Sequence, residues 1–506
     1  MTSLPVQAPA LCTRFPPEPS GRLHAGHIKS IMYNYSFSKQ KKGRFILRFD
    51  DSNPETCTQE YVDYIQEDIK LMGIIPDDVY YMSNYFDTIE KYMTDLICNG
   101  MAYVDTDDSA TITLNRRLRK DSVSRTNTIA ENLVLWDGMR HACNTYVARL
   151  KINMTDNNGS LRDPIAYRVC PVPHYRTAQT HNVYPLFDFI SPIVDALQNV
   201  THIMRTGEFI DKIPLHKWIL EQLNMPKPVY KSFSRMNLSH TILSKRKLRT
   251  IVENTDLDWE HPMIPTIRGL YNRGLRMDAF LQFFAKNMSF KTNRAVDDWD
   301  CILKINRTLI DRSCYKLFAL GEDMVSLKIT LPSTPVPKSL SGDVYVNMMN
   351  KDLGTRDAHY PDHQVFIDRK DHGELVDGQK VLLLMYDAYE YRDGCLTLIS
   401  KDGLDLKSTY KMSWLAESHY VKVTLMICNA LLTKPVIEDG DDIMDILSVP
   451  LFKLKQVYVE DYILSIEKGQ TIQLYRMGYF IAQSINPYVL VHINEPGNTK
   501  QFLLNA

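Results

Sequence analysis

Residues Thr13–Glu55 read TRFPPEPSGRLHAGHIKSIMYNYSFSKQKKGRFILRFDDSNPE. A short run with β character, Leu11–Phe15, leads into the proline-rich loop Pro16–Gly21, which can neither continue a strand nor start a helix. After Gly26 a helical period begins, and its apolar face carries Ile28, Ile31, Met32 and Tyr35. The apolar run Phe45–Phe49 has the length of a buried strand. This order predicts a βαβ unit.

Polar residues stand where such a unit binds ligands, at the carboxyl ends of its strands. His24, Gly26 and His27 surround the helix start, and Asp50 follows the second strand. A helix N-terminus favours phosphate, a glycine admits a nucleotide close to the backbone, and imidazoles can donate hydrogen bonds as charge develops at phosphorus. For this motif alone, an ordinary helix start with two surface histidines is the alternative.

A second candidate motif, Ile242–Lys247 (ILSKRK), lies far downstream. Its Ser244 and Lys245 are suited to contact the same phosphates. The surrounding segment contains no acid and carries Lys231, Arg235, Lys245, Arg246, Lys247 and Arg249. Such a local field accepts phosphates, although composition alone equally allows an ordinary basic surface.

The two motifs resemble the HIGH and KMSKS signatures of class I aminoacyl-tRNA synthetases. The context is similar to the glutamyl/glutaminyl-tRNA synthetase family of eukaryotic type in RFPPEPSGRLHAGH, RFDDSNPE, YVDYIQEDIKLMGI, SRMNL and LSKRKL. The resemblance extends from about Leu11 to the C-terminal strands. An ordinary dinucleotide-binding domain is disfavoured, because no G-x-G-x-x-G follows the first strand.

The resemblance implies an α/β + β fold. We expect a loose tail over 1–10 and a Rossmann-like class I catalytic domain over 11–235, interrupted by an acceptor-stem-binding insertion over 84–181. A helical connecting subdomain with the LSKRK loop should follow over 236–325, and C-terminal β-barrel anticodon-binding domains over 326–506. The glutamyl branch is favoured by Ser191–Asp195 and Trp414–Ala416, and the glutaminyl branch is the closest rival.

The local pattern predicts further elements. After the insertion, the run Val183–Phe189 should form the end of a strand. A helix should follow to about Leu197, and a further strand should occupy Val200–Met204. Hairpin turns are predicted at Asp393-Gly394 and Met477-Gly478. Short strands of the last region are expected at Val325–Leu331, Gly342–Met348, Gln364–Asp368, Lys380–Tyr389, Cys395–Ser400, Tyr420–Ile427, Thr471–Leu474 and Tyr479–Ala482.

The reaction implied is ATP-dependent activation of L-glutamate to glutamyl-adenylate, followed by transfer to the terminal adenosine of tRNA(Glu). Neither step needs a protein nucleophile, since positioning and charge stabilisation suffice. The residues implied to be catalytic are His24, His27 and Lys245. ATP, carrying Mg²⁺, is expected at His24, Gly26, His27, Glu208, Leu243, Ser244, Lys245 and Arg246.

The resemblance also implies how the amino acid is bound, at family positions that carry the opposite charge. A carboxylate, Asp50, should hold the α-ammonium, and Arg205 should hold the side-chain carboxylate, because arginine binds carboxylates in a bidentate manner. The alternative for Arg205 is a contact with tRNA or an internal acid. Phe187 stands where the family usually has tyrosine, and Ala25 replaces the isoleucine of the first motif. The implied glutamate site comprises Arg14, Pro16, Glu18, Asp50, Tyr184, Phe187 and Arg205.

Binding of tRNA is expected at Arg116, Arg117, Arg119, Lys120 and Lys247. A solvated helix face is the alternative for the run from Arg116 to Lys120. We expect a monomer whose partners are tRNA(Glu), L-glutamate and ATP, without a membrane. Scaffold partners are disfavoured, because no appended N-terminal interaction domain precedes the catalytic fold. A catalytically inactive tRNA-binding relative is an alternative of another class, although it would lose His27 or Lys245.

Composition limits the remaining possibilities. A chain of 506 residues requires several domains, and the net charge of −1 means that RNA binding must use local basic patches. The nine cysteines are scattered without a C-x-x-C, so we expect no protein-bound zinc. Scattered thiols and the lack of a secretory or membrane-spanning apolar run predict a cytoplasmic enzyme.

Overall fold

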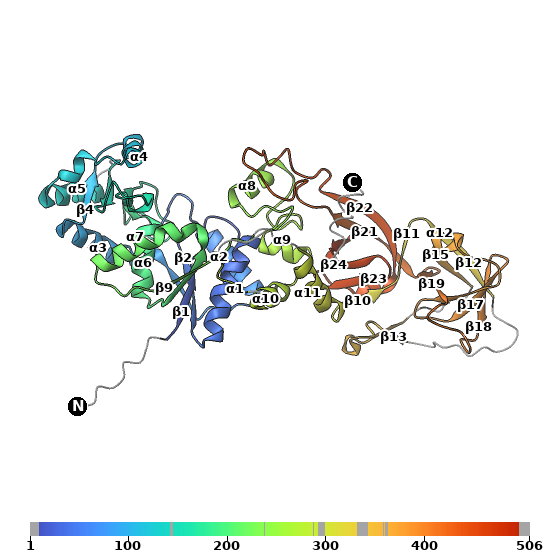
Figure 1. Cartoon of the computed structure of the whole chain (residues 1–506). Helices are drawn as coiled ribbons and strands as arrows, with labels where there is room; N and C mark the ends of the chain where they lie inside the picture. Colours follow the sequence, from blue (N-terminus) through green and yellow to red (C-terminus); the bar gives the residue numbers. More distant parts are fainter. Residues whose placement is uncertain are drawn as a thin grey trace, which may run out of the picture. The chain divides into compact units, whose positions relative to one another are not determined.

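The computed structural model describes residues 10–141, 145–236, 238–286, 288–291, 299–330, 343–357, 359 and 363–494 (Figure 1). These residues form two compact units that divide near residue 237, and the stretch that begins at Phe284 belongs to the first unit. Of the predicted tail over 1–10, only residue 10 is described. No helix among the described residues is long and apolar enough to cross a membrane.

The predicted βαβ unit is confirmed in the first unit. Strand β1 (Cys12–Phe15) and strand β2 (Arg44–Phe49) are parallel and are joined by helix α1 (Ala25–Gln40), which buries Ile28, Ile31 and Met32. Gly43 allows the chain to enter β2, because a Cβ there would meet the Leu11 carbonyl oxygen at 2.4 Å. Helix α2 (Gln59–Leu71) then leads to β3 (Asp78–Tyr81), parallel to β2.

The sheet continues on the other side of β1. The Thr201 N–H donates to the Cys12 carbonyl at 3.0 Å, which places β8 (His202–Thr206) beside β1, and β9 (Val229–Phe233) is parallel to β8. The Thr13 hydroxyl donates to the Asn34 carbonyl at 2.8 Å, and the Asn34 side-chain amide donates to the Met204 carbonyl at 3.3 Å. The two strands therefore advance in the same direction from Cys12 and Thr201. The spatial order is therefore β9, β8, β1, β2, β3, with the carboxyl ends at one edge. Ligands of open α/β sheets bind where such an order reverses, here between β1 and β8.

Two predicted boundaries in this unit were wrong. The strand predicted to stop at Met204 continues to Thr206, so Arg205 lies within it. The run Val183–Phe189 is split between β7 (Val183–Pro185), which pairs with a strand of the insertion, and α6 (Phe187–Leu197). The break follows from Pro185, which has no N–H for a ladder, and from Asp188, which favours a helical first turn.

The region of the predicted insertion is built on an antiparallel sheet in the order β4-β5-β6-β7, and its last strand follows residue 181. Helices pack on this sheet, and α7 follows β8 in the first unit. The bounds are α3 (Phe86–Cys98), β4 (Ala102–Asp105), α4 (Ser109–Leu118), α5 (Ile129–His141), β5 (Val147–Leu150), β6 (Ile165–Val169) and α7 (Ile213–Gln222).

Helices open the second unit, as the pattern predicted. The expected LSKRK loop is different, because the helix begins at Lys245 itself and only Leu243 and Ser244 precede it. Strands also begin before residue 326, at Tyr315. The bounds are α8 (Lys245–Asn254), α9 (Ile267–Asn272), α10 (Met277–Lys286), α11 (Trp299–Asp311), β10 (Tyr315–Leu317) and β11 (Ala319–Gly321).

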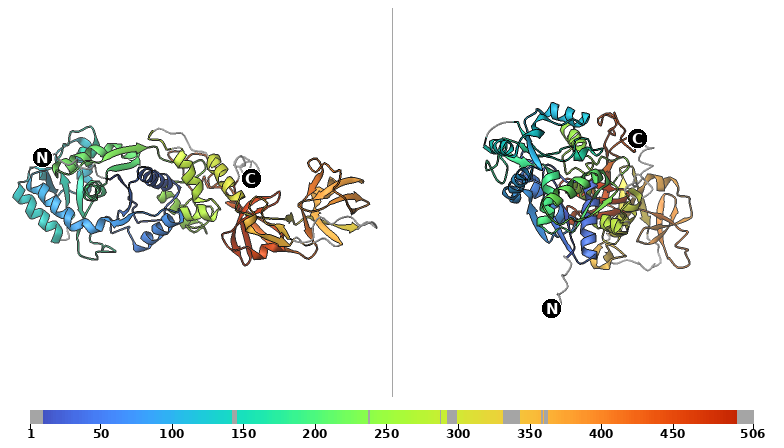
Figure 2. Two further views of the ribbon diagram at one scale, coloured as in Figure 1. Left: turned by 90° about the horizontal axis from the view of Figure 1, so that it is seen from below. Right: turned by 60° about the vertical axis from the view of Figure 1, so that its left-hand side comes forward.

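The described C-terminal residues form two seven-stranded sheets, in the orders β10-β23-β24-β25-β21-β22-β11 and β19-β16-β17-β18-β12-β15-β20. Figure 2 shows them as separate bodies, coloured red and orange. A two-stranded hairpin, β13–β14, and the short helix α12 (Arg369–Gly373) accompany them. The strand bounds are β12 (Met324–Thr330), β13 (Asp343–Tyr345), β14 (Thr355–Asp357), β15 (Gln364–Asp368), β16 (Gln379–Leu383), β17 (Ala388–Arg392), β18 (Cys395–Ile399), β19 (Tyr410–Met412), β20 (Trp414–Ala416), β21 (Tyr420–Cys428), β22 (Phe452–Glu460), β23 (Thr471–Leu474), β24 (Gly478–Ile485) and β25 (Tyr488–Ile493).

Each sheet curls until its two outermost strands follow one another in the chain. Strands β10 and β11 end the first sheet and are separated only by Phe318, and strands β19 and β20 end the second and are separated only by Ser413. A sheet whose edges are one residue apart must be nearly closed, which confirms the barrel-like architecture. The predicted hairpin at Asp393-Gly394 is also confirmed, with φ of 48° and 74° between antiparallel β17 and β18.

Some strand predictions differ from the structure. The expected strand Lys380–Tyr389 is two strands, β16 and β17, because the chain turns around Met385, which has a φ of 60°. Strands β22 and β25 had not been predicted, and the expected strand Gly342–Met348 is shorter, with Gly342 outside the described residues.

Candidate active site

His24 and His27 lie side by side at the N-terminus of α1, with ring centroids 4.0 Å apart. His24 is the N-cap residue, and its Nδ1 accepts the Gly26 N–H at 3.1 Å, while Nδ1 of His27 accepts the His24 N–H at 3.1 Å. Both Nδ1 atoms are therefore acceptors, which places the proton of each neutral ring on Nε2. The two Nε2–H groups are the donors that this helix start can offer to an anion.

Asp50 follows β2 at the same edge of the sheet and is almost completely buried. The Ser52 hydroxyl donates to its Oδ1 at 2.8 Å. Burial raises the pKa of Asp50 to about 7, and the nearby carboxylate of Glu18 adds to the effect. Glu18 itself is exposed and accepts a hydrogen bond from Thr56 at 2.9 Å. A buried carboxyl with a raised pKa is stabilised in its charged form by a cation, as an ammonium group would provide.

Arg205 is a buried cation that forms no ion pair with the residues that the structure describes. Its guanidinium lies 4.3 Å from the ring centroid of Phe209 and 5.6 Å from that of Phe187. Its Nη1 has no hydrogen-bond partner among the described residues, and burial, together with the charge of Arg14, lowers the pKa of Arg205 to about 10. The carboxylates of Asp195 and Asp188 offset this lowering only in part. An anionic ligand would compensate the buried charge further.

Arg14 is also buried, but its partner is part of the protein. Its Nε and Nη2 donate to the two carboxylate oxygens of Asp195 at 3.1 Å each, and Nη2 of Arg48 approaches the same carboxylate at 2.8 Å. Burial would raise the pKa of Asp195, but the charges of Arg14 and Arg48 lower it below its ordinary value. Arg14 therefore has an anion within the fold, whereas Arg205 forms no ion pair with the described residues.

Further polar residues lie around Arg205, and the sequence analysis did not predict them as site residues. The Tyr230 hydroxyl is buried without a partner among the described residues, and burial raises its pKa, with a further contribution from Asp195. His216 Nε2 lies 3.5 Å from Asp188 Oδ1, and Lys212 Nζ lies 2.6 Å from Asp188 Oδ2. No spacing in the sequence links these residues to Arg205, because they come from different elements that meet only in the fold.

The other predicted ligand residues have different environments. Tyr184 is fully buried in β7, and its hydroxyl donates to the His181 carbonyl at 3.1 Å. Glu208 is half exposed and accepts a hydrogen bond from Thr206 at 3.0 Å. Pro16 is half-buried in the loop after β1, and Phe187 begins α6.

The second motif belongs to the second unit. Ser244 is the N-cap residue of α8, and Lys245, Arg246 and Lys247 form its first turn. Lysine and arginine are unfavourable at a helix N-terminus, because they face the positive end of the dipole. The cationic first turn therefore destabilises the start of α8. A bound anion would reduce the repulsion between these side chains and the helix dipole.

The basic run of the insertion has two roles in the fold. Arg116 donates to the carbonyls of Arg162 and Gly159 at 3.1 and 3.0 Å, and Arg119 donates to Asn157 Oδ1 at 3.1 Å. These two arginines hold the end of α4 against the segment 157–162, and Arg117, Arg119 and Lys120 are exposed. The exposed residues keep a basic surface at the end of this helix.

Comparisons with known proteins agree with this arrangement. Residues 10–312 match the catalytic domain model of the tRNA synthetases class I (E and Q), and residues 411–483 match the anticodon-binding domain model of the same group. The chain is 33% identical to the bifunctional glutamate/proline–tRNA ligase of Cricetulus griseus over 96% of its length, but spans only 34% of that protein. It is 34% identical to the probable cytoplasmic glutamate–tRNA ligase of Schizosaccharomyces pombe, over 93% of this chain and 67% of the relative.

Among solved structures, a glutamate tRNA ligase from Elizabethkingia meningosepticum in complex with its amino acid aligns with a TM-score of 0.44 and 18% identity. The alignment covers 60% of the present chain and 69% of the Elizabethkingia chain. This similarity is too weak to support an argument about the site.

Proposed function

The chain belongs to the class I tRNA synthetases for glutamate and glutamine, and on that premise we propose that it is a glutamate–tRNA ligase. In the first step, the α-carboxylate of L-glutamate attacks the α-phosphorus of ATP, forming the glutamyl-adenylate and releasing pyrophosphate. In the second step, a ribose hydroxyl of the terminal adenosine of tRNA(Glu) takes the acyl group, and AMP leaves.

The observation that carries the choice of glutamate is the buried guanidinium of Arg205, whose Nη1 has no hydrogen-bond partner among the described residues. The substrate's side-chain carboxylate would pair with it, and the neutral amide of glutamine would leave the charge uncompensated. Phe187 and Phe209 hold the guanidinium without offering it a hydrogen-bond acceptor from their side chains. The curated relatives named above are glutamate–tRNA ligases, which supports the same choice.

The remaining residues have roles that fit their environments. Asp50 receives the α-ammonium, whose charge keeps the carboxylate ionised. His24 and His27 donate from Nε2 to the phosphates of ATP, and Gly26 lets the nucleotide approach the backbone. Lys245 stabilises the charge that develops on the phosphates, next to Ser244 and Arg246. ATP enters as its Mg²⁺ complex, so the metal is part of the substrate.

We assign tRNA recognition to two regions. Arg117 and Lys120 of the insertion, with Lys247 of α8, contact the phosphate backbone of tRNA(Glu). The barrel-like sheets read the anticodon, in keeping with the match of residues 411–483 to an anticodon-binding domain. The enzyme acts in the cytoplasm, as does the relative from Schizosaccharomyces pombe according to its name.

The test is pyrophosphate exchange into ATP with total tRNA present, measured separately with glutamate and with glutamine. We expect exchange that depends on glutamate. Exchange with glutamine instead would assign the chain to the other branch of the family. No exchange with either amino acid, from a folded protein that still binds tRNA, would identify an inactive tRNA-binding relative.

A further inference from the structure

A cluster of two histidines and one aspartate lies where three segments of the second unit meet. His419 lies in the turn between β20 and β21, Asp461 follows β22, and His359 lies beyond β14. Nδ1 of His419 is 3.0 Å and Nε2 of His359 is 3.2 Å from the same carboxylate oxygen, Oδ2 of Asp461. All three side chains are partly exposed, so ions can reach them from solvent.

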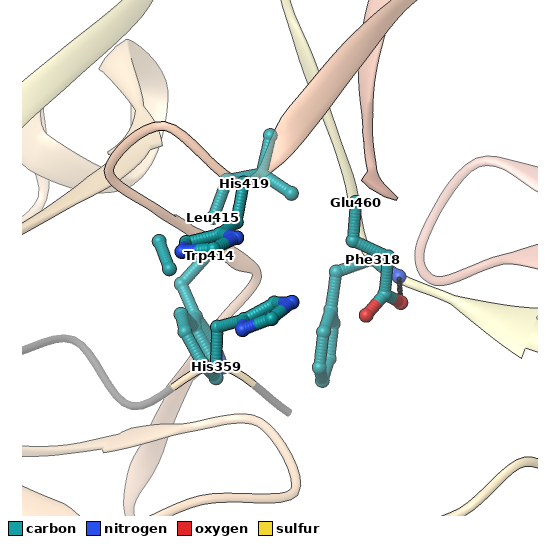
Figure 3. A pocket seen from close by; sticks show the side chains of 7 residues that line it. Phe318, His359, Trp414, Leu415, His419 and Glu460 are labelled. Carbon is teal, nitrogen blue, oxygen red and sulfur yellow. Dashed lines mark hydrogen bonds between the residues drawn. The ribbon is translucent and has the colours of Figure 1, made fainter. Parts of the chain in front are cut away.

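The two imidazole rings face each other, as Figure 3 shows, with centroids 3.6 Å apart and an angle of 15° between their planes. Their facing nitrogens therefore lie on the same side of the cluster as the carboxylate of Asp461. Both nitrogens converge on one carboxylate oxygen, Oδ2 of Asp461. The cluster therefore has the charge and the donors of a cation site.

The spacing fits a tetrahedral transition metal. Ligand atoms at about 2.0–2.2 Å from Zn²⁺ lie roughly 3.4 Å apart at the corners of a tetrahedron. The two N–O distances of 3.0 and 3.2 Å are close to that value, and one ligand atom from each of the three residues can be chosen so that all lie within 4.8 Å of one another. A small opening of the cluster would admit the ion.

We propose that His359, His419 and Asp461 form a binding site for a divalent transition metal of the zinc class, with water as the fourth ligand. Imidazole nitrogen distinguishes such metals from Mg²⁺ and Ca²⁺, which prefer oxygen ligands. The prediction that no zinc would be bound rested on cysteine spacing and does not bear on this nitrogen and oxygen site.

The structural consequence is a cross-link between the two sheets. The cluster joins the end of β20, which belongs to the second sheet, to the end of β22, which belongs to the first. Behind the histidines, Phe318 and Trp414 pack with ring centroids 5.4 Å apart and line the same pocket as His359 and His419 (Figure 3). Glu460, although adjacent to Asp461, is paired with Arg356 and accepts the Phe318 N–H at 2.6 Å. The bound ion would hold this junction of the two sheets in one geometry.

The first experiment uses Co²⁺ as a spectroscopic substitute for Zn²⁺ on the whole chain without ATP. We expect one Co²⁺ with the intense visible bands of tetrahedral coordination, displaced by Zn²⁺ and unaffected by Mg²⁺. His419→Gln and Asp461→Asn should each weaken Co²⁺ binding by more than about 100-fold. Loss of a residue that only hydrogen-bonds to a metal ligand weakens binding by about 100-fold at most. His363→Gln, at an exposed histidine outside the cluster, is the matched control and should bind normally. Absence of the tetrahedral bands, or equal binding by all variants, would overturn the proposal.

A second measurement needs no variant and is specific for each residue. Diethylpyrocarbonate modifies accessible imidazole nitrogens, and peptide mass spectrometry locates the products. Zn²⁺ should protect His359 and His419 but leave the modification of His363 unchanged. If protection is confined to other histidines, such as the pair at His24 and His27, or if none occurs, the site does not exist.

Discussion

The guanidinium of Arg14 forms two hydrogen bonds of 3.1 Å with the carboxylate of Asp195, and both side chains are buried. Arg48 approaches the same carboxylate at 2.8 Å. One anion is thus shared by two cations in the middle of the parallel sheet, and the cluster keeps a net positive charge. Arg205 differs from Arg14, because its Nη1 has no hydrogen-bond partner among the described residues.

The first prediction concerns this pair. Asp195→Asn should lower the free energy of unfolding by about 3–5 kcal/mol, because it leaves two buried cations without their anion. Urea denaturation followed by circular dichroism measures the change. The matched control is Asp137→Asn, whose partner Arg140 is on the surface, and the expected change there is below about 1 kcal/mol. Equal stability of the two variants would refute the structural role of Asp195.

Arg205→Cys should change the choice of amino acid. Loss of the cation leaves the substrate carboxylate desolvated and unpaired, whereas glutamine carries no such charge. The ratio of kcat/KM for glutamate to that for glutamine should therefore fall at least about tenfold, or about 1.4 kcal/mol. Aminoacylation of a mixture of both tRNAs measures it, after the fold has been checked.

Arg205→Lys serves as the control for this variant. It keeps the positive charge but loses the planar, bidentate fork, so its ratio should lie between those of the wild type and Arg205→Cys. A parallel loss for both amino acids would show that Arg205 serves the α-carboxylate, ATP or tRNA instead.

Asp50→Asn should stabilise the protein and abolish glutamate activation. Burial raises the pKa of Asp50 from 3.8 to about 7. Between these values the unfolded chain binds fewer protons than the folded chain, so wild-type stability falls as pH rises through this window and remains low above it. Each pKa unit is worth about 1.4 kcal/mol, so at pH 8 the variant should gain at most about 4 kcal/mol.

Urea denaturation of both proteins at several pH values between 4 and 8 tests this prediction, and the stability difference should disappear toward the acid end. Glutamate-dependent pyrophosphate exchange should be lost, because no carboxylate remains for the ammonium group. A wild type that is more stable than the variant at pH 8, or a variant that still activates glutamate normally, would contradict the assignment of Asp50.

Lys245→Ala should slow activation without a matching loss of tRNA affinity. Removal of one preorganised contact to developing charge costs about 10²–10³ in rate. Pyrophosphate exchange measures activation, and filter binding measures the affinity for tRNA. Arg249→Ala, an exposed cation on the same helix, should leave exchange within a few-fold of the wild type. Exchange that is unchanged in Lys245→Ala would exclude Lys245 from the phosphate site.

Local signals predicted the first βαβ unit. The proline-rich segment indicates a loop, the helical period indicates a helix, and the apolar run indicates a buried strand. They failed at Val183–Phe189, where a proline and a helix-favouring aspartate divide an apparently continuous strand. The pairing of Arg14 with Asp195 could not be predicted, since it joins residues 181 positions apart. The same holds for His359, His419 and Asp461, which become neighbours only when the two sheets close.

The central claim is that this chain attaches glutamate, and not glutamine, to tRNA. Purified protein should be given ATP, Mg²⁺ and total tRNA with either radiolabelled glutamate or radiolabelled glutamine, and acid-precipitable label should be counted over time. The account predicts that kcat/KM for glutamate exceeds that for glutamine by about 10⁴, as expected of a site built to pair a specific polar group. Equal or preferential charging with glutamine would contradict it.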